Sequence, residues 1–339
     1  MELITEVDLG VIRSNLARAR RAAGTRVLVM VKADAYGHGM TEVAHALCRD
    51  VDFFGVATSE EGVELRKNGI STPVLVAICG EEDLESAAAN SLTVAVADRA
   101  SLCALADMPK ELRPAFHLKV DTGMHRLGFA PSEVGAVVEF MSSRGIAPCG
   151  VYSHFREPNE EQLSVFREIA GRVKEKFPEA VAHIASSSSL NMKGAAFDMV
   201  RLGHAVYVGA MTVKSRVVAV RRAKAGECVG YGHFRLTRDT SLAVVFGGYF
   251  DGVRRESPAP VLIGGRLCPA VGSVCMDMFA VDVGDAEVRK GDEVILLGKG
   301  FSAEQVAAAR GTTDYEVMTC WRGRAKRIYR DETGSENES

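Results

Sequence analysis

The stretch VLVMVKADAYGHGM, residues 27–40, joins an apolar run to a lysine and a glycine-containing, aromatic loop. The run from Val27 to Val31 predicts a strand that is covered on both faces, as in a parallel sheet. Lys32 follows this strand directly and meets a turn. A charge at the end of a buried strand needs a physical reason, and the surrounding sequence supplies one.

Similar short apolar runs recur from Val27 to about Tyr207 and alternate with stretches of helical spacing. The eight runs are VLVMV, FFGVA, PVLVA, LTVAV, FHLKV, GVYSHF, AHIAS and MVRL; two of the intervening stretches are SEEGVELRKN and NEEQLSVFREIAGRVKEKF. Strands that alternate with helices predict an α/β fold with a parallel sheet. Eight candidate strands favour an N-terminal (β/α)8 TIM barrel over an open doubly wound sheet, which usually has fewer strands.

The pattern changes after about Lys214 to short β-like segments separated by glycine, proline and charged turns. The segments are RVVAVRRA, SLAVVF, PVLIGGRL, AVGSVCMDMFAVDV and DEVILLG. They predict a C-terminal, mostly-β domain. We therefore expect a barrel over residues 1–213 and a β-strand domain over residues 214–339, with a flexible tail from about residue 331.

Length, charge and cysteine pattern bound the class of protein. The 339 residues suffice for two domains, and a formal net charge of -3 gives no electrostatic reason to expect nucleic acid as a partner. No segment is apolar enough to cross a membrane and the amino terminus does not look like a signal peptide, so we expect a cytoplasmic protein. The eight scattered cysteines form no C-x-x-C pair, so we expect neither a metal site nor a disulfide framework.

Polar side chains follow several of the predicted strands. In a barrel, reactive groups project from the carboxyl ends of the strands, so residues at these ends share one mouth. Each such residue taken alone is more often structural, as a lysine in a salt bridge is. Together they predict a site at the mouth. The residues are Lys32, Lys119, Arg126, His154, Ser186, Ser187 and Arg201.

A lysine at this mouth suggests carbonyl chemistry. Burial and neighbouring cations can keep a lysine amine partly unprotonated, so that it forms a Schiff base with a carbonyl such as that of pyridoxal phosphate. A phosphate needs hydroxyl and backbone N–H donors, and Ser187, Gly203 and His204 offer them near adjacent strand ends. Serine runs are also common loop caps, so the phosphate site is one of two readings.

Seven motifs carry a resemblance to a known family. VKADAYGHG, HLKVDTGMHRLGF, GVYSHF, MVRLGHAVYVG, GGYFDG, VGSVCMDM and TTDYE stand in this order. The series resembles that of the fold-type III alanine racemases, which use pyridoxal phosphate. The likeness extends from Val7 to IYR near the carboxyl end, and so covers nearly the whole chain.

The resemblance implies two catalytic bases. Lys32 matches the lysine that carries the cofactor and acts as one base, and Tyr36 matches a tyrosine near its phosphate. Tyr249 in GGYFDG matches the second base, which in the family comes from the β domain of the other subunit. A homodimer with shared active sites is therefore implied.

The resemblance also assigns the residues around the bases. Arg201 matches the arginine that faces the pyridine nitrogen, and His154 matches the imidazole beside the cofactor. Arg126 matches an arginine near the tyrosine and the substrate carboxylate. Lys119 matches a lysine that is carbamylated in some members. Four further positions match the substrate-side loop and a tyrosine that helps hold the phosphate and narrows the entrance, namely Cys275, Met276 and Asp277 in the loop, and Tyr315.

Elementary chemistry agrees with a two-base racemase. A proton leaves one face of the α-carbon and returns to the other, so Lys32 and Tyr249 on opposite faces form a simple solution. A phenol is a weak base unless cations favour the phenolate, and we name His154 and Arg126 as those cations. Arg201 donates hydrogen bonds only, so a pyridine nitrogen facing it stays unprotonated, which favours brief proton transfer over transamination.

Three positions depart from the family pattern. Ser186 stands where many relatives have asparagine, Leu202 where proline is common, and His204 where an aliphatic residue is usual. These changes can alter the contacts to the phosphate.

Two alternatives to racemisation of L-alanine to D-alanine for peptidoglycan stay open. The same scaffold can racemise serine or a broader set of amino acids. Specificity depends on the pocket volume near Tyr315 and Met276, and one extra group on the substrate shifts selectivity by only about 1–3 kcal/mol. A non-catalytic pyridoxal-phosphate-binding protein is less favoured, because this chain keeps GGYFDG and VCMDM. A decarboxylase is disfavoured by Arg201, since an acidic partner of the ring nitrogen is expected there.

Overall fold

The computed structural model describes residues 2–331, so most of the expected flexible tail lies outside the described residues. Contacts divide the chain into two units, which we describe separately. The barrel unit holds residues 13–35 and 40–206, and the β unit holds residues 2–12, 36–39 and 207–331. The boundary expected between residues 213 and 214 stays a prediction.

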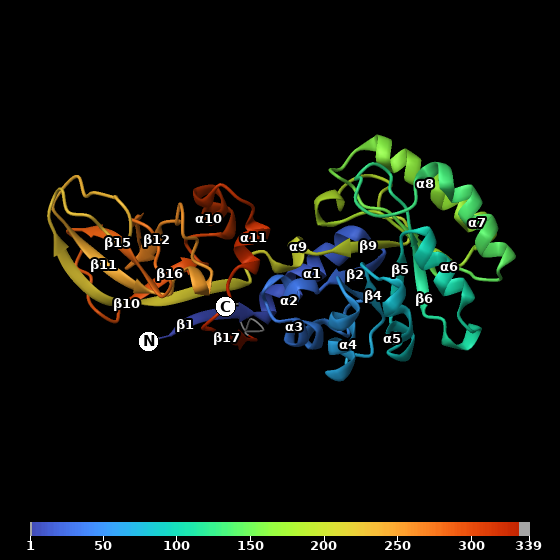
Figure 1. The fold of residues 1–339 in the computed structure, drawn as a ribbon, viewed down its shortest axis with the longest axis horizontal. Helices are drawn as coiled ribbons and strands as arrows, with labels where there is room; N and C mark the ends of the chain where they lie inside the picture. Colours follow the sequence, from blue (N-terminus) through green and yellow to red (C-terminus); the bar gives the residue numbers. More distant parts are fainter. Residues whose placement is uncertain (1, 332–339) are drawn as a thin grey trace, which may run out of the picture. The chain divides into compact units, whose positions relative to one another are not determined.

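The barrel unit contains a parallel sheet of eight strands, as predicted, and each predicted apolar run contributes one strand. The strands are β2 (Arg26–Met30), β3 (Phe53–Val56), β4 (Val74–Val76), β5 (Thr93–Val96), β6 (Ala115–Lys119), β7 (Gly150–Tyr152), β8 (Val181–His183) and β9 (Met199–Leu202). Neighbours in sequence pair in space from β2 to β8, and β9 pairs with β2 (Figure 1). The predicted TIM barrel is therefore confirmed.

The barrel is nearly closed between its last two strands. A single parallel bridge joins Ser186 to Arg201 there. The Arg201 N–H donates to the Ala185 carbonyl oxygen at 3.0 Å, and the Asp198 N–H donates to the Ala182 carbonyl oxygen at 3.0 Å. Closure brings the carboxyl ends of β8 and β9 beside that of β2, where Lys32 follows.

Helices follow most of the strands. The α-helices are α1 (Leu9–Ala23), α3 (Met40–Leu47), α4 (Ser59–Lys67), α5 (Leu84–Ala89), α6 (Arg99–Asp107), α7 (Val134–Ser143), α8 (Glu160–Lys176) and α9 (His204–Tyr207); one-turn helices occupy Glu81–Asp83, Lys110–Leu112, Pro131–Glu133 and Ser187–Ser189. The two predicted helical stretches form α4 and α8. Each is capped by a side chain, Thr58 accepting from the Glu61 N–H and Asn159 from the Gln162 N–H.

The first barrel strand is buried on both faces, as its unbroken apolar run predicts. Leu28 packs inside the barrel with Leu75 and Met199, and Val27 and Val29 are also fully buried. Gly55 on the next strand leaves room for this layer, because a Cβ there would lie 2.5 Å from the sulfur of Met30. The interior is therefore a packed core, and chemistry is confined to the mouth.

The β unit is built on a nine-stranded sheet. Its strands are β1 (Leu3–Asp8), β10 (Met211–Ala223), β11 (Thr240–Phe246), β12 (Val261–Ile263), β13 (Arg266–Cys268), β14 (Ala270–Val271), β15 (Met278–Gly284), β16 (Glu293–Leu297) and β17 (Ala325–Arg330); its helices are α10 (Ala303–Arg310), α11 (Asp314–Thr319) and the one-turn helix Tyr249–Asp251. All five predicted β segments contribute strands, so the mostly-β expectation is confirmed. The order is β13-β12-β16-β10-β11-β15-β14.

The amino-terminal strand belongs to this second sheet. β1 pairs antiparallel with β10 and parallel with β17, so the two ends of the described chain meet in one sheet. The long strand β10 serves three neighbours, and its pairing shifts register at two places. Such irregularities bend a strand and let it leave one partner for the next.

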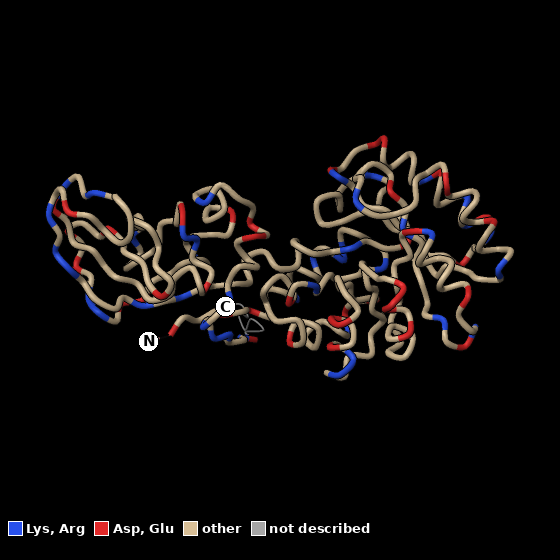
Figure 2. Tube along the Cα trace, in the orientation of Figure 1, with Lys and Arg blue, Asp and Glu red and all other residues tan. Residues whose placement is uncertain are grey.

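Charged residues of both signs are spread over both units (Figure 2). None of the helices within residues 2–331 combines the length and the apolarity that a membrane crossing requires. All eight cysteines are free thiols.

Candidate active site

Lys32 stands where β2 ends, and the chain turns in an unusual way behind it. The segment labelled α2 (Lys32–Tyr36) is a left-handed turn, with φ of 52°, 55° and 52° at Ala33, Asp34 and Ala35. Left-handed backbone costs about 1–2 kcal/mol at each non-glycine residue, so such a run needs support from its surroundings. The Glu61 carboxylate gives that support by accepting the Ala33 N–H at 2.8 Å.

Burial lowers the pKa of the Lys32 amine from its ordinary value, and the charge of Arg126 lowers it further. Glu61 acts in the opposite direction. A lowered pKa increases the fraction of unprotonated amine, which is the form that reacts with a carbonyl. Reaction with a carbonyl is therefore a physical reason for a lysine at the end of this buried strand.

Arg201 lies on β9 at the same mouth and is only 6% exposed. Its Nη2 donates to the Ser153 carbonyl oxygen at 2.6 Å and to the Ile184 carbonyl oxygen at 3.2 Å. Its Nη1 donates to the imidazole of His183 at 2.7 Å. Burial lowers the pKa of Arg201 to about 10, so the guanidinium is still charged at neutral pH. Carbonyl and imidazole acceptors thus hold a buried cation.

Two histidines behind Arg201 are fixed in their tautomers. Because a guanidinium can only donate, His183 must accept through Nδ1 and carry its proton on Nε2. That Nε2 lies 2.8 Å from Nδ1 of His117, which therefore accepts in turn. Burial and the charge of Arg201 lower the pKa of His117 to about 3 and hold that of His183 well below its ordinary value. Gly150 leaves room for the His117 ring, which a Cβ there would approach to 2.7 Å.

His154 is a neutral group at this site, and our expectation that it acts as a cation is wrong. Its Nδ1 accepts a hydrogen bond from Nη2 of Arg201 at 3.0 Å. Burial, followed by the charges of Arg201 and Arg126, lowers its pKa to about 3. Burial and the neighbouring cations both disfavour a positive charge on this imidazole.

The loop after β6 carries Arg126 and is organised by one carboxylate. Asp121 Oδ1 accepts the N–H groups of Gly123 and Met124 at 2.9 and 2.8 Å, and Oδ2 accepts the Arg126 N–H at 3.0 Å. Burial opposes ionisation of Asp121, but these hydrogen bonds outweigh it and keep its pKa below the usual range. The loop shape is therefore fixed by a charged side chain that the sequence places in DTGM.

Lys119 ends β6 and is 6% exposed. Its ammonium nitrogen lies 5.3 Å from the ring centre of Tyr152. Burial first, and then the charges of Arg126 and Arg201, lower its pKa to about 8. The barrel mouth thus gathers cationic residues that disfavour one another's charge, which suits an anionic ligand.

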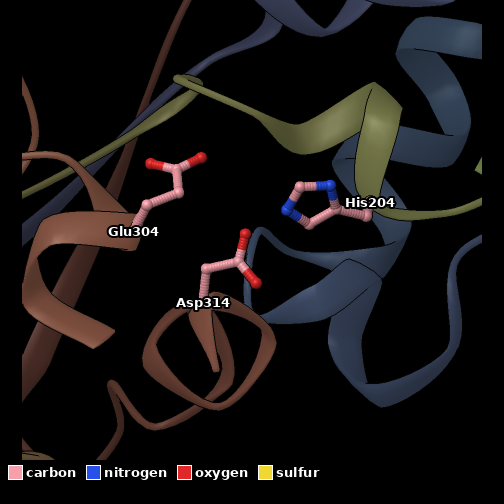
Figure 3. Close-up of side chains that lie close together, drawn as sticks. All are labelled: His204, Glu304 and Asp314. Carbon is pink, nitrogen blue, oxygen red and sulfur yellow. The ribbon is translucent and has the colours of Figure 1, made fainter. Parts of the chain in front are cut away.

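Ser187 and the chain after β9 form the candidate phosphate cradle. Oγ of Ser187 accepts the Gly203 N–H at 3.0 Å and the Ala205 N–H at 3.2 Å. His204 stands between these residues at the start of α9, where Figure 3 labels it. Ser186 contacts the neighbouring Ser188 through its hydroxyl at 3.2 Å. The Ser187 hydroxyl therefore draws two backbone N–H groups together, and phosphate binding by Ser187, Gly203 and His204 stays a prediction.

The remaining candidate residues lie in the β unit, in two groups. The first is aromatic: Tyr36 stacks on Tyr207 with ring centres 5.0 Å apart, and Tyr315 lies 6.1 Å from Tyr36. Burial, aided by Tyr315, raises the pKa of Tyr36 to about 12, so it is a hydrogen-bond donor at neutral pH. Burial and Asp314 likewise raise the pKa of Tyr315.

Asp314 begins α11, next to Tyr315. Figure 3 labels its carboxylate and that of Glu304 on α10. Oxygen atoms of these two carboxylates lie within 4.8 Å of each other. Burial first, and then the negative charge of Asp314, favours the protonated form of the Tyr315 phenol.

The second group surrounds Tyr249, whose side chain is 40% exposed. Tyr249 begins the one-turn helix after β11, and its N–H donates to the Cys275 carbonyl oxygen at 3.1 Å. The guanidinium of Arg255 lies 5.6 Å from the centre of its ring. In the facing loop, Met276 follows Cys275 and is 52% exposed. Asp277 accepts a hydrogen bond from Nη1 of Arg324 at 2.8 Å.

Several supporting residues were not found from the sequence. Glu61 sits in a stretch that was noted only for helical spacing, and His117 precedes Lys119 by two places on the same strand. A strand pattern of period two could have placed His117 on the face of Lys119. The other missed residues are His183, Tyr207, Asp251, Arg255 and Arg324.

Comparison with known proteins finds matches along nearly the whole chain. The family model described as "Alanine racemase, N-terminal domain" matches residues 7–211, and the one described as "Alanine racemase, C-terminal domain" matches residues 210–329. A protein named alanine racemase from Pectobacterium atrosepticum is 39% identical over 337 residues, covering 91% of this chain and 93% of that protein. One of the same name from Mycobacterium avium is 36% identical over 365 residues, covering 96% and 94%.

Solved structures agree with these matches. The biosynthetic alanine racemase from Pseudomonas aeruginosa superposes with a TM-score of 0.90 at 34% identity, covering 97% of this chain and 100% of that chain. The alanine racemase from D-cycloserine producing Streptomyces lavendulae gives a TM-score of 0.89 at 31% identity, covering 97% of both chains. Relatives and structural neighbours thus share one isomerase name.

Proposed function

This chain belongs to the alanine racemase family, and we propose that it interconverts L- and D-alanine with bound pyridoxal phosphate and two bases. The observation that carries the proposal is the pairing, at one barrel mouth, of Lys32 with a lowered pKa and of Arg201 as a buried permanent cation. An amine that loses its proton more readily than an ordinary lysine, and a hydrogen-bond donor that cannot accept, suit a lysine-linked pyridine cofactor in a racemase.

The residues present fit this cofactor. Cations act on the two lysines of the barrel mouth: the charge of Arg126 lowers the pKa of Lys32 and of Lys119, and that of Arg201 lowers the pKa of Lys119. The carboxylates of Glu61 and Asp121 act in the opposite direction, on Lys32 and Lys119 respectively. The Ser187 hydroxyl accepts the N–H groups of Gly203 and Ala205, and its own hydrogen is free to be donated to a phosphate oxygen. We assign Lys32, Arg201, His154, Ser187, Gly203 and His204 to cofactor binding in the barrel unit, and Tyr36 and Tyr315 to it in the β unit.

Bound pyridoxal phosphate supplies an electron-withdrawing ring that makes the α-proton of the amino acid acidic. Lys32 moves this proton on one face of the α-carbon. Arg201 would donate to the ring nitrogen and leave it unprotonated, which would limit side reactions. His154 accepts from Arg201 and so holds the guanidinium in place, as its neutral state allows.

Tyr249 moves the proton on the opposite face, and we propose that it comes from the partner subunit of a homodimer. Exposed apolar side chains close to it support an interface: Phe250, the next residue, is 57% exposed, and Met276 in the facing loop is 52% exposed. We assign Arg126 to binding of the substrate carboxylate and Met276 to the substrate-side loop. Cys275 and Asp277 support Met276 within its loop.

Shared sites have a direct test. We expect the variants Lys32→Ala and Tyr249→Phe each to be inactive or slow, whereas a dimer that contains one subunit of each would retain one intact site. Mixing the two variants under subunit exchange should therefore restore activity. Recovery that never exceeds the sum of the separate variants would show that each subunit completes its own site.

Lys119 is proposed to react with carbon dioxide, losing a proton and gaining a carbamate anion. Its pKa of about 8 leaves part of the amine unprotonated at neutral pH, which is the reactive form. The anion would relieve the repulsion among the cations of the mouth. Intact-protein mass under non-acidic conditions tests the modification, and a bare amine in the presence of bicarbonate would remove it.

The decisive measurement is enantiomer exchange of L-alanine, L-serine and L-lysine, with and without added pyridoxal phosphate. We expect cofactor-dependent exchange that is fastest for alanine. Fast serine exchange beside negligible alanine exchange would favour the serine or broader-specificity alternative. Cofactor binding without any exchange would favour a non-catalytic binding protein. In a bacterium, D-alanine made in the cytoplasm would serve cell-wall peptidoglycan.

A further inference from the structure

Two loops of the β unit carry Tyr249, assigned to proton transfer, and Met276, assigned to substrate binding. The backbones of these loops contact each other directly. The first, residues 247–252, follows β11 and contains Tyr249; the second, residues 272–277, precedes β15 and contains Met276. Besides the bond from Tyr249 to Cys275, the Gly247 N–H donates to the Asp277 carbonyl oxygen at 2.9 Å. The position of one loop therefore depends on the other.

Contact between the loops is close enough to require glycine. A Cβ on Gly248 would lie 2.2 Å from the carbonyl oxygens of both Cys275 and Met276. Distances of this size are far inside van der Waals contact. The loops continue the paired strands β11 and β15, and a third backbone bond joins them, from the Phe250 N–H to the Met276 carbonyl oxygen at 3.4 Å. A side chain that contacts both loops adds to this support.

Arg324 provides a contact to both loops at once. This residue precedes β17, and its Nε and Nη2 donate to the two oxygens of Asp251 at 3.0 and 2.6 Å. Its Nη1 donates to Oδ1 of Asp277 at 2.8 Å. Asp251 belongs to the first loop and Asp277 to the second. One planar guanidinium thus joins two carboxylates, and its five fixed donors make this geometry possible.

The bond to Asp251 continues towards Tyr249. Asp251 has no exposed surface, and its Oδ2 also accepts the Gly248 N–H at 3.0 Å. Gly248 directly precedes Tyr249. The guanidinium of Arg324 also lies 5.3 Å from the ring centres of Phe246 and Phe250. These rings restrict its movement in addition to the two carboxylates.

We propose that Arg324 is a positioning residue, which holds the Tyr249 loop against the Met276 loop by bridging Asp251 and Asp277. The proposal rests on the proposed role of Tyr249 as a base. It adds a group that touches neither substrate nor cofactor and acts through two carboxylates. The nearest alternative is a purely structural role, in which Arg324 contributes to folding of the sheet but not to the placement of Tyr249.

Arg324→Lys separates these roles. Lysine keeps the charge, but its single ammonium cannot reproduce a two-point contact with Asp251 together with one to Asp277. Arg322→Lys is the matched control, because Nε of Arg322 donates to the Thr319 carbonyl oxygen at 3.4 Å and not to a carboxylate. Both changes occur in the same short segment before β17, so effects on its folding are matched.

Amide hydrogen exchange followed by mass spectrometry gives a readout that does not depend on activity. In Arg324→Lys, we expect faster exchange in peptides covering residues 247–252 and 272–277, with peptides of the barrel unit unchanged. Arg322→Lys should leave all of these at the wild-type rate. Equal protection of the two loops in Arg324→Lys and in the wild type would overturn the proposal.

Kinetics then tests positioning. A misplacement of about 1 Å can cost on the order of 100-fold, so we expect kcat of Arg324→Lys to fall about 10- to 100-fold. The loss should fall on solvent-proton exchange at the face that Tyr249→Phe also affects, and the double variant should be little worse than Tyr249→Phe alone. Unchanged kcat with loosened loops, or an equal loss on both faces, would leave Arg324 purely structural and overturn the proposal.

Failure of the proposed function gives a different result. If Tyr249→Phe leaves proton exchange intact on both faces, the second base has been assigned wrongly and positioning of that base is overturned with it. Faster amide exchange in Arg324→Lys would then still show that Arg324 joins the loops.

Discussion

Arg201 in the barrel unit and Arg324 in the β unit are both fixed by several hydrogen bonds, but their surroundings differ. Arg201 is 6% exposed and donates to carbonyl oxygens and neutral imidazoles. The side chain of Arg324 is 38% exposed and donates to two carboxylates. Burial lowers the pKa of Arg201 to about 10, whereas the hydrogen bonds that Arg324 donates to Asp251 and Asp277 raise the pKa of Arg324.

The difference teaches how each region holds a functional side chain. Rigid strands and burial fix Arg201 without neutralising it, so its charge is available to a ligand. Loops lack that rigidity, and carboxylates are needed to bind them together, which neutralises Arg324. We therefore expect changes in the barrel mouth to affect chemistry and global stability, and changes around Arg324 to affect loop placement.

The largest effect is expected for Lys32→Ala. Loss of a residue that both carries the cofactor and transfers a proton should reduce enantiomer exchange by more than about 10⁴-fold. Exchange of L-alanine with added pyridoxal phosphate is the measurement, and Lys67→Ala on the exposed face of α4 is the control. Residual turnover near the wild-type level would refute the role of the barrel mouth.

Tyr249→Phe tests the other region. Removing one hydroxyl should slow proton transfer about 10²- to 10⁴-fold on one face only, because Lys32 still serves the other. Solvent-deuterium incorporation from each pure enantiomer measures the two faces separately. Tyr231→Phe, an exposed tyrosine of the same unit, is the control. Equal slowing from both enantiomers would count against two bases.

Arg201→Lys sharpens the contrast in stability. Lysine cannot satisfy the carbonyl oxygens of Ser153 and Ile184 and the imidazole of His183 together, and an unsatisfied buried acceptor costs about 1–3 kcal/mol. Urea unfolding should show a loss of this size. Arg324→Lys should change the unfolding midpoint less, and a larger shift for Arg324→Lys would reverse the comparison.

Ser187→Ala should have a smaller effect, on cofactor affinity. The substitution removes one hydroxyl but leaves the N–H groups of Gly203 and Ala205, so binding of pyridoxal phosphate should weaken about tenfold or less, corresponding to about 1 kcal/mol. Equilibrium dialysis against the free cofactor measures it. Ser188→Ala, an exposed neighbour in the same turn, should bind as the wild type does. If both variants bind equally well, the cradle is assigned wrongly.

The smallest effect is a slope of stability against pH. The folded chain releases the Lys119 proton near pH 8, whereas an unfolded lysine does so near 10.5, so the unfolded state binds more protons between these values. Stability should therefore rise as pH increases through that window. Urea unfolding of unmodified protein across it is the measurement, and Lys119→Met should lack this contribution. A wild-type slope no steeper than that of the variant would show that the pKa of Lys119 is not lowered in the folded protein.

Much of the fold could be predicted because it depends on local patterns. Unbroken apolar runs marked all eight barrel strands, and glycine-rich turns marked the strands of the second sheet. The pairing of β1 with β10 and β17 could not be predicted, since it joins residues from opposite ends of the chain. A strand of alternating pattern carries no information about which distant strand it will meet.

The candidate site was predictable in its residues but not in their states. Lysine, arginine and histidine at strand ends could be read from the sequence. The neutrality of His154 could not, because its pKa depends on burial and on cations from several strands. Nor could the left-handed turn at residues 33–35, which the distant Glu61 supports.

By itself the sequence determined which residues sit at the ends of barrel strands, because hydrophobic period and turn residues are properties of short segments. Only the tertiary structure decided which charges survive there and what holds each loop, because desolvation and charge interactions depend on distances between segments that are far apart in the chain. Arg324 shows the division: the sequence makes it one arginine among many, and folding places it between two carboxylates.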